Sequence, residues 1–369
     1  MKPLDLRGLP SSQEVMICRD QGYFPVLVNP AGDEILAVLR GGAGHLGITG
    51  RLDAVRSPDG GLTWEPPTVI VDSEADDRNP AVGLMPDGSI VLAYQKQSSY
   101  GEHGNWEHGA DRVQMLVTRS ADGGASWEAS RPLSYEPMSK HCGYGHIITL
   151  PDGTALMPIY GPRLGAQEET PSHSYILRSR DGGRTWDEPS LIAEGYSETA
   201  LLVLLDGALL AAMRSERPGL NTQCLGVCRS DDEGYTWSEP VRVTETSEHP
   251  ADLTRLSNGW VLMVFGIRHE PRGVQGLISK DEGRTWEARR LILCDDLEHE
   301  DLGYPSTAKL GDRIVTAYYN APLILKEADW EYHDRVVPEW QIDRGDFRGE
   351  GAFARALLYS EKELLGALT

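Results

Sequence analysis

The amino-acid sequence predicts an all-β fold, a six-bladed β-propeller built from four-stranded antiparallel blades. Two repeats that run in phase carry this prediction, and the near absence of helical periodicity supports it. The first repeat is a polar turn with the pattern Ser-x-Asp-x-Gly-x-Thr/Ser-Trp, here called the Asp turn. The Asp turns end at Trp64, Trp127, Trp186, Trp237 and Trp286. They follow one another at intervals of about fifty to sixty residues, a period typical of propeller blades.

The second repeat is a pair of short apolar runs joined by a tight turn rich in Gly, Asp or Asn. Such a pair predicts a β-hairpin. The hairpins cover residues 23–40, 79–95, 144–161, 198–214, 249–266 and 304–319. The first five are followed by a third run that ends in an Asp turn and by a fourth run, such as "PTVIVD" after Trp64. Six units of four strands make six blades.

The sixth unit has no Asp turn, so its outer strand is expected from another part of the chain. A closed propeller joins its last blade to its first. Residues 14–19 ("EVMICR") precede the first hairpin and form a short strand-like run. We therefore expect them to be the closing outer strand of blade six, and residues 1–369 to form a single propeller domain.

Charge and composition narrow the classes of partner. The formal net charge of -21 makes nucleic acid and anionic membrane surfaces poor partners. No apolar run reaches membrane-spanning length, and the N-terminus lacks the apolar stretch of a signal peptide. The five cysteines are an odd number without zinc-type paired spacing. These features predict a cytoplasmic protein with reduced thiols and no cofactor, and they leave the oligomeric state open.

Strand direction separates the loops into two groups. Because strands within a blade are antiparallel, the hairpin turns and Asp turns share one face of the ring, and the remaining loops share the other. The loops on this second face vary in length and hold most of the histidines and many of the arginines. Variable polar loops on a rigid scaffold are where function usually lies. The Asp turns, by contrast, are expected to be scaffold, with Asp accepting backbone N–H bonds and Trp packing on the blade.

Asp turns on a six-bladed ring resemble those of the sialidase (neuraminidase) superfamily, the BNR-repeat proteins. In that family a tyrosine is the nucleophile, a glutamate activates it, an aspartate is the acid/base and three arginines hold the substrate carboxylate. The resemblance implies that Tyr304 in "DLGYPSTAKL" is the nucleophile and Glu198 in "SETALLV" its base. It also places Arg214 and Arg272 in the arginine triad, with Arg268 nearby.

Two positions depart from the family pattern. The Arg-Ile-Pro expected at the start of blade one is Tyr23-Phe24-Pro25 here, so one arginine is missing. The loop that should carry the acid/base aspartate reads "GGAGHLGITGR" and contains His45 but no carboxylate. His45 is therefore the candidate acid, because imidazole titrates near neutrality. The candidate replacements for the missing cation are Arg40, Arg51 and Arg78.

Four further polar residues lie at or near the starts of first strands. They are His141, Tyr144, His249 and Asp252. The topology predicts that they converge on the centre of the ring and contact the substrate. Ligands from separate blades can in principle meet around a metal, but the chain has no short-range His-x-x-x-His pair. We predict no metal.

The leading hypothesis is a sialidase-like glycoside hydrolase acting on an anionic sugar such as sialic acid. Two alternatives stay open. A polysaccharide lyase or hydrolase acting on uronic-acid glycans would use Tyr304 with His249 or His141, and a non-catalytic propeller would only bind carbohydrate. A hydrogen bond between Tyr304 and Glu198 favours the first hypothesis. Tyr304 facing a histidine favours the lyase, and a centre filled by Phe24 favours the binding module.

Overall fold

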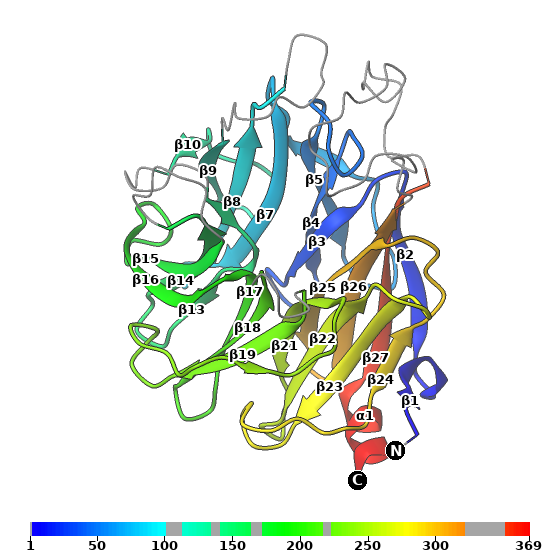
Figure 1. Ribbon diagram of the computed structural model, residues 1–369. Coiled ribbons are helices and arrows are strands. Elements are labelled where there is room, and N and C mark those ends of the chain that lie inside the picture. Colours follow the sequence, from blue (N-terminus) through cyan, green and yellow to red (C-terminus); the bar gives the residue numbers. More distant parts are fainter. Residues whose placement is uncertain (1, 101–112, 134–140, 164–171, 217–222, 322–350) are drawn as a thin grey trace.

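Six small β-sheets surround a central axis in the computed structural model, with their first strands facing inward (Figure 1). The structure describes residues 2–100, 113–133, 141–163, 172–216, 223–321 and 351–369. Parts of the long loops singled out in the sequence, including 101–112, 164–171, 217–222 and 322–350, lie outside the described residues. The predicted six-bladed β-propeller is confirmed.

The blades follow one another along the chain. Blade one is β3 (Tyr23–Val28), β4 (Ile35–Gly41), β5 (Arg51–Ser57) and β6 (Thr68–Val71). Blade two is β7 (Asp76–Leu84), β8 (Ile90–Gln97), β9 (Val113–Ser120) and β10 (Arg131–Pro132). Blade four is β17 (Tyr196–Val203), β18 (Leu209–Ser215), β19 (Leu225–Ser230) and β20 (Val241–Arg242). Blade five is β21 (Glu248–Arg255), β22 (Val261–Ile267), β23 (Gly273–Ser279) and β24 (Leu291–Cys294).

Blade three departs from the regular plan at its inner edge. Its inner run is broken into β11 (Cys142–Gly143), β12 (Gly145–His146) and β13 (Ile148–Thr149), followed by β14 (Ala155–Gly161), β15 (His173–Ser179) and β16 (Asp187–Glu194). Gly145 has φ of +62°, which interrupts the strand. As a result β12 pairs in parallel with β7 of blade two instead of with β14.

Blade six is completed by the N-terminal part of the chain. Its strands are β25 (Asp301–Leu310), β26 (Arg313–Ala321), β27 (Phe353–Ser360) and β2 (Gln13–Arg19). Strand β2 pairs antiparallel with β27, from Gln13 opposite Leu358 to Arg19 opposite Phe353. This is the position that the sequence analysis assigns to residues 14–19. The preceding β1 (Leu4–Asp5) adds in parallel to β24 of blade five.

The Asp turns lie between blades and connect them. In the turn of blade three, Asp181 Oδ1 accepts the Thr185 amide at 2.9 Å, and Trp186 Nε1 donates to the Gly183 carbonyl at 3.1 Å. Trp186 is 5% exposed and packs in a core cluster shared by blades two and three. Gly183 itself lies against Val91 of blade two. The Asp turns are therefore scaffold that holds each blade against the one before it.

A β-bulge near the start of the inner strands shapes the axis of the ring. The ladders shift register between Tyr23 and Val26, Arg78 and Ala81, Ser197 and Thr199, Glu248 and Ala251, and Gly303 and Ser306. Four non-glycine residues at these bulges have φ in the left-handed region. They are Phe24, Asn79, Glu198 and Tyr304. Bulges re-aim side chains and are common beside active sites. Prolines follow three of the four, and they are tolerated because the inner strand is a blade edge.

The described chain contains little helix. A short 3₁₀ turn, Leu6–Gly8, follows β1, and α1 (Glu361–Leu368) ends the chain. Ser360 caps α1 by accepting the Glu363 amide at 3.2 Å. None of the helices in the described ranges is long and apolar enough to cross a membrane.

Candidate active site

A hydrogen-bonded chain of three side chains lies where blades four and six meet the axis. The Tyr304 hydroxyl donates to Glu198 Oε1, and Arg214 Nη1 donates to Glu198 Oε2 at 3.1 Å. Glu198 and Tyr304 come from the bulges of β17 and β25, and Arg214 from the end of β18. Glu198 is 5% exposed. The three residues that the resemblance assigns to the site are thus linked by hydrogen bonds through Glu198.

The surroundings of Tyr304 favour the neutral form of its phenol. Burial and the negative charge of Glu198 raise the pKa of the Tyr304 phenol well above its usual range, although the charges of Arg214 and Arg268 oppose this. A neutral phenol beside a carboxylate can release its proton to Glu198 as its oxygen attacks. The pair therefore has the arrangement of a nucleophile and its base.

Arg268 is the blade-five arginine that lies against Tyr304. Its guanidinium lies 5.6 Å from the centre of the Tyr304 ring, and its Nη2 donates to the Leu302 carbonyl at 3.0 Å. Arg272, which the resemblance favoured for the triad, instead forms ion pairs with Glu270 and, at 3.0 Å, with Glu300. The structure therefore places Arg268 against the Tyr304 ring, whereas two neighbouring carboxylates engage the Arg272 guanidinium.

An aromatic wall occupies the side of Tyr304 where the family has its first arginine. The Phe24 ring lies 4.8 Å from the Tyr304 ring and 5.2 Å from the His45 ring. Tyr319 and Tyr23 complete this wall, with ring centres 5.4 and 6.0 Å from that of Phe24. The missing cation is thus replaced here by packed rings.

His45 is held by a buried carboxylate of blade six. Its Nδ1 lies 3.0 Å from Asp301 Oδ2, and Asp301 also accepts a hydrogen bond from the Tyr319 hydroxyl. Burial alone would raise the pKa of Asp301, but the charge and hydrogen bond of His45 and the Tyr319 contact lower it. Asp301 is therefore ionised at neutral pH and orients the imidazole. About a quarter of the His45 side chain remains exposed, at 24%.

His249 and Tyr144 lie beside the same group. His249 is fully buried, and within the described chain neither of its ring nitrogens has a hydrogen-bond partner. Burial and the positive charges of Arg268 and Arg214 hold the pKa of His249 well below its ordinary range, so the ring is neutral at neutral pH. Tyr144 donates to the Ala251 carbonyl at 3.2 Å. Its ring centre lies 5.8 Å from that of Tyr304.

Asp252 faces a small cavity on the axis. Its Oδ2 accepts the Thr307 amide at 2.7 Å, its Oδ1 lies 3.6 Å from His146 Nε2, and burial raises its pKa. His146 Nε2 in turn lies 2.9 Å from Ser306 Oγ. The cavity that these side chains line with Tyr304 has a volume of about 20 Å³, room for about one water molecule. It belongs to the packed axis and does not accommodate a sugar.

Two predicted site residues, Arg51 and His141, lie away from the Tyr304–Glu198 pair. Arg51 pairs with Asp53 at 2.9 Å and lines a separate surface hollow with Asp72 and Glu74. His141 is buried with its ring centre 6.0 Å from that of Tyr175, and burial lowers its pKa to about 4. The structure does not bring these two side chains to the Tyr304–Glu198 pair, because Arg51 forms an ion pair and His141 packs in the core.

Arg78 and Arg40 are also engaged within the protein. Arg78 Nη1 lies 3.5 Å from Asp76 Oδ2, and Arg78 Nε donates to Asn79 Oδ1 at 3.2 Å. Arg40 is fully buried against the same aspartate, at 2.6 Å. Neither arginine is therefore positioned as the replacement for the missing cation.

Sequence reasoning missed four polar residues near the site. They are Asp301, His146, Asn79 and Asp76. One sequence signal could have found Asn79. Phe24, Asn79, His249 and Tyr304 each precede a proline at the start of an inner strand. The dipeptides Phe-Pro, Asn-Pro, His-Pro and Tyr-Pro thus mark equivalent places in four blades.

Across the described residues, no group of three or more His, Cys, Asp or Glu side chains is arranged to hold a metal ion. All five cysteines are buried free thiols.

The fold and this site define a class of protein, the Asp-turn propellers with a tyrosine–glutamate pair at the axis. The chain belongs to the BNR repeat-like domain family, whose model matches residues 51–316, and thus to the sialidase/BNR repeat superfamily. A sialidase of Bacteroides fragilis is 23% identical over 300 residues, covering 72% of this chain and 53% of that protein. The chain spans about half the length of the curated relatives it matches.

Solved structures share the fold. A protein of unknown function from Dyadobacter fermentans superposes with a TM-score of 0.73 at 23% identity, covering 95% of this chain and all of that chain. The sialidase of Trypanosoma rangeli, solved with 2,3-difluorosialic acid as a covalent intermediate, superposes with a TM-score of 0.65 at 14% identity. This superposition covers 97% of this chain and 60% of the T. rangeli sialidase chain. The chain therefore has the fold of sialidase-like glycoside hydrolases.

Proposed function

We propose that this protein is a retaining exo-glycosidase of the sialidase type that removes an anionic sugar, sialic acid or a related carboxylated sugar. The observation that carries the proposal is the contact of the Tyr304 hydroxyl with Glu198, which is itself bound to Arg214 at 3.1 Å. This is the geometry that favours hydrolysis over the lyase alternative, in which Tyr304 would face a histidine.

In the first step the Tyr304 oxygen attacks the anomeric carbon while its proton passes to Glu198. The bond from that carbon to the leaving oxygen breaks, and His45 donates a proton to that oxygen. In the second step water attacks the same carbon, giving its proton to His45, and Tyr304 leaves and regains its proton from Glu198. Two inversions retain the stereochemistry. A neutral nucleophile suits a carboxylated sugar, since an anionic one would be repelled.

The substrate carboxylate is expected to bind to Arg214 and Arg268. Arginine presents donors in a planar fork that matches a carboxylate. These two guanidinium groups flank Tyr304 from blades four and five. With Phe24 in the place of the third arginine, we expect weaker carboxylate binding than a three-arginine site provides.

The test is covalent trapping. The protein is incubated with 2,3-difluorosialic acid, digested and analysed by mass spectrometry, in parallel with release of 4-methylumbelliferone from the corresponding sialoside. We expect the peptide containing Tyr304 to gain the mass of one fluorinated sugar, and Tyr304→Phe to abolish both labelling and turnover. A labelled glutamate or histidine, or unchanged turnover by Tyr304→Phe, would contradict the proposed mechanism. An aryl glycoside of glucuronic acid, assayed alongside, tests the uronic-acid alternative.

One observation favours a second candidate, a propeller that binds carbohydrate without cleaving it. Phe24 is 6% exposed and packs on Tyr304 where the family has a cation. Binding of free sialic acid in calorimetry, together with no labelling and no turnover, would support that candidate over the hydrolase.

A further inference from the structure

The loop of residues 42–50 between β4 and β5 carries His45 but has little rigidity of its own. Four of its nine residues are glycine. Glycine loses more conformational freedom on folding than any other residue. For His45 to keep one position, the surroundings have to hold this loop.

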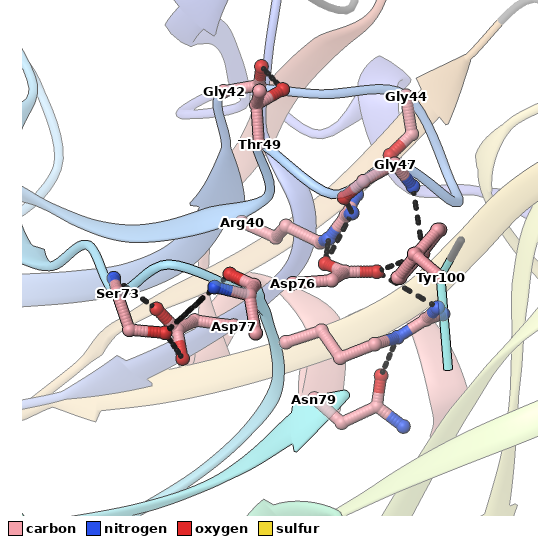
Figure 2. Close-up of polar contacts among 12 residues, drawn as sticks. Arg40, Gly42, Gly44, Gly47, Thr49, Ser73, Asp76, Asp77, Asn79 and Tyr100 are labelled. Carbon is pink, nitrogen blue, oxygen red and sulfur yellow. Dashed lines mark hydrogen bonds and ion pairs between the residues drawn. The ribbon is translucent and has the colours of Figure 1, made fainter. Parts of the chain in front are cut away.

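A buried ion pair lies against the loop (Figure 2). Arg40 Nη2 lies 2.6 Å from Asp76 Oδ1, and both side chains are completely buried. The same guanidinium donates to the carbonyl oxygen of Gly44 and, at 3.3 Å, to that of Gly47. Arg40 thus binds the backbone on both sides of His45, and Asp76 neutralises and orients Arg40.

Asp76 reaches the loop by a second route. Its Oδ2 accepts a hydrogen bond from the Tyr100 hydroxyl at 2.7 Å, and the Tyr100 oxygen accepts the Gly47 amide at 3.0 Å. The next residue adds a main-chain contact, because the Asp77 amide donates to the Gly50 carbonyl at 2.8 Å. Figure 2 shows Arg40 and Tyr100 approaching Asp76 from different directions.

The loop backbone packs closely against the ion pair at Gly50. A Cβ added to Gly50 would lie 2.1 Å from Asp76 Oδ1 and 2.3 Å from Arg40 Nη2. Side-chain Cβ atoms in proteins essentially never approach non-bonded atoms this closely, so the backbone of the loop at Gly50 lies directly against the ion pair. Neither charged side chain is exposed, and the polar contacts of Arg40 join Asp76 to the backbone of the loop.

We propose that Asp76 is a positioning residue: through Arg40 and Tyr100 it fixes loop 42–50 and so sets the place of His45 beside the aromatic wall and Asp301. The catalytic consequence rests on the proposed function, in which His45 is the acid. The structural consequence, an ordered Gly47 amide, does not depend on that function.

Two variants and a matched control test the proposal. Asp76→Asn removes the charge that orients Arg40, and Tyr100→Phe removes only the hydroxyl between Asp76 and Gly47. The second variant is included because an unpaired buried arginine is strongly destabilising, and Asp76→Asn can fail to fold for that reason. The control is Asp77→Asn, whose carboxylate bonds Ser73 at 2.7 and 3.0 Å and not the loop. Figure 2 shows Asp77 directed toward Ser73.

The first measurement is hydrogen exchange of the Gly47 amide by NMR. We expect protection to fall at least tenfold in Asp76→Asn and Tyr100→Phe and to stay within twofold of the wild type in Asp77→Asn. Wild-type protection in both test variants, or an equal fall in the control, would overturn the proposal. This outcome is independent of whether the protein is a glycosidase.

The second measurement compares two substrates. An aryl leaving group departs with little help from an acid, whereas the sugar leaving group of 3′-sialyllactose needs a proton. We expect kcat/KM for 3′-sialyllactose to fall at least tenfold more than that for the 4-methylumbelliferyl sialoside, in Tyr100→Phe as in His45→Ala. Equal losses on both substrates would overturn the role in positioning His45. If the wild type cleaves neither substrate, the proposed function fails while the exchange experiment still decides the role of Asp76.

Discussion

Backbone strain and chemistry coincide at single residues of this protein. Tyr304 and Glu198 both have positive φ, at +46° and +30°, and both are proposed to take part in the reaction. Such conformations cost about 1–3 kcal/mol each and persist where the surrounding structure imposes them. Here the bulged inner strand imposes them, and it turns the two side chains toward each other across the axis.

The two blade-five arginines are expected to differ in function. Arg268→Ala should weaken binding of sialic acid by about 2–5 kcal/mol, because a desolvated carboxylate loses a charged partner. Arg272→Ala should cost less than about 1 kcal/mol, since exposed ion pairs with Glu270 and Glu300 already engage that guanidinium. Titration calorimetry at fixed low salt gives both values.

A neutral analogue in which the carboxylate is reduced to an alcohol is the control for charge. It should lose little affinity in Arg268→Ala. Equal losses for the acid and the alcohol would mean that Arg268 does not recognise the carboxylate, and a larger effect of Arg272→Ala would restore the assignment made from the sequence.

At the scale of elements, the Asp turn is an inter-blade connection and not a catalytic feature. Asp181 satisfies the backbone of its own turn, and Trp186 fills the space between blades two and three. The turns also lie on the face opposite His45, Arg214 and Arg268, which follow or end second strands. The same sequence pattern therefore recurs in five turns because each turn packs one blade against the one before it.

Trp186→Ala is expected to lower the free energy of unfolding by about 3 kcal/mol, the scale of a truncated buried aromatic side chain. Trp64→Ala should cost less, because Trp64 is only partly buried. Denaturant unfolding measures both. Turnover per folded molecule should be unchanged, and a loss of turnover with a wild-type melting curve would contradict the scaffold assignment.

At the scale of the whole molecule, the N-terminal segment connects two blades. Strand β2 is the outer strand of blade six, β1 adds to blade five, and the intervening Leu6 is fully buried in the core between them. The first nineteen residues therefore link blade six to blade five.

Deletion of residues 1–19 is expected to lower the melting temperature by more than 10 °C or to prevent folding, because it removes two paired strands and leaves the edge of β27 open. Deletion of residues 1–3 alone is the control, since it leaves β1 and β2 in place. Differential scanning calorimetry compares the two. A wild-type melting temperature for the longer deletion would refute the role of this segment in closing the ring.

Local sequence was sufficient to predict the architecture, and the family resemblance added the central pair of the site. The repeats place six hairpins and five Asp turns, and each is specified by side chains within a few residues of one another. Tyr304 and Glu198 were predictable because the family resemblance assigns roles to fixed places in the repeating unit. The ring geometry then requires equivalent places in different blades to meet at the axis.

The tertiary structure alone decided which charged groups remain available at the site. Arg51 and Arg272 pair with nearby carboxylates, His141 is buried in a core, and Arg268 is left against Tyr304. The partner of His45 is Asp301, 256 residues away in the chain. Coulomb and hydrogen-bond energies depend on distances of a few ångströms in space, and the sequence order of residues on different blades does not contain those distances.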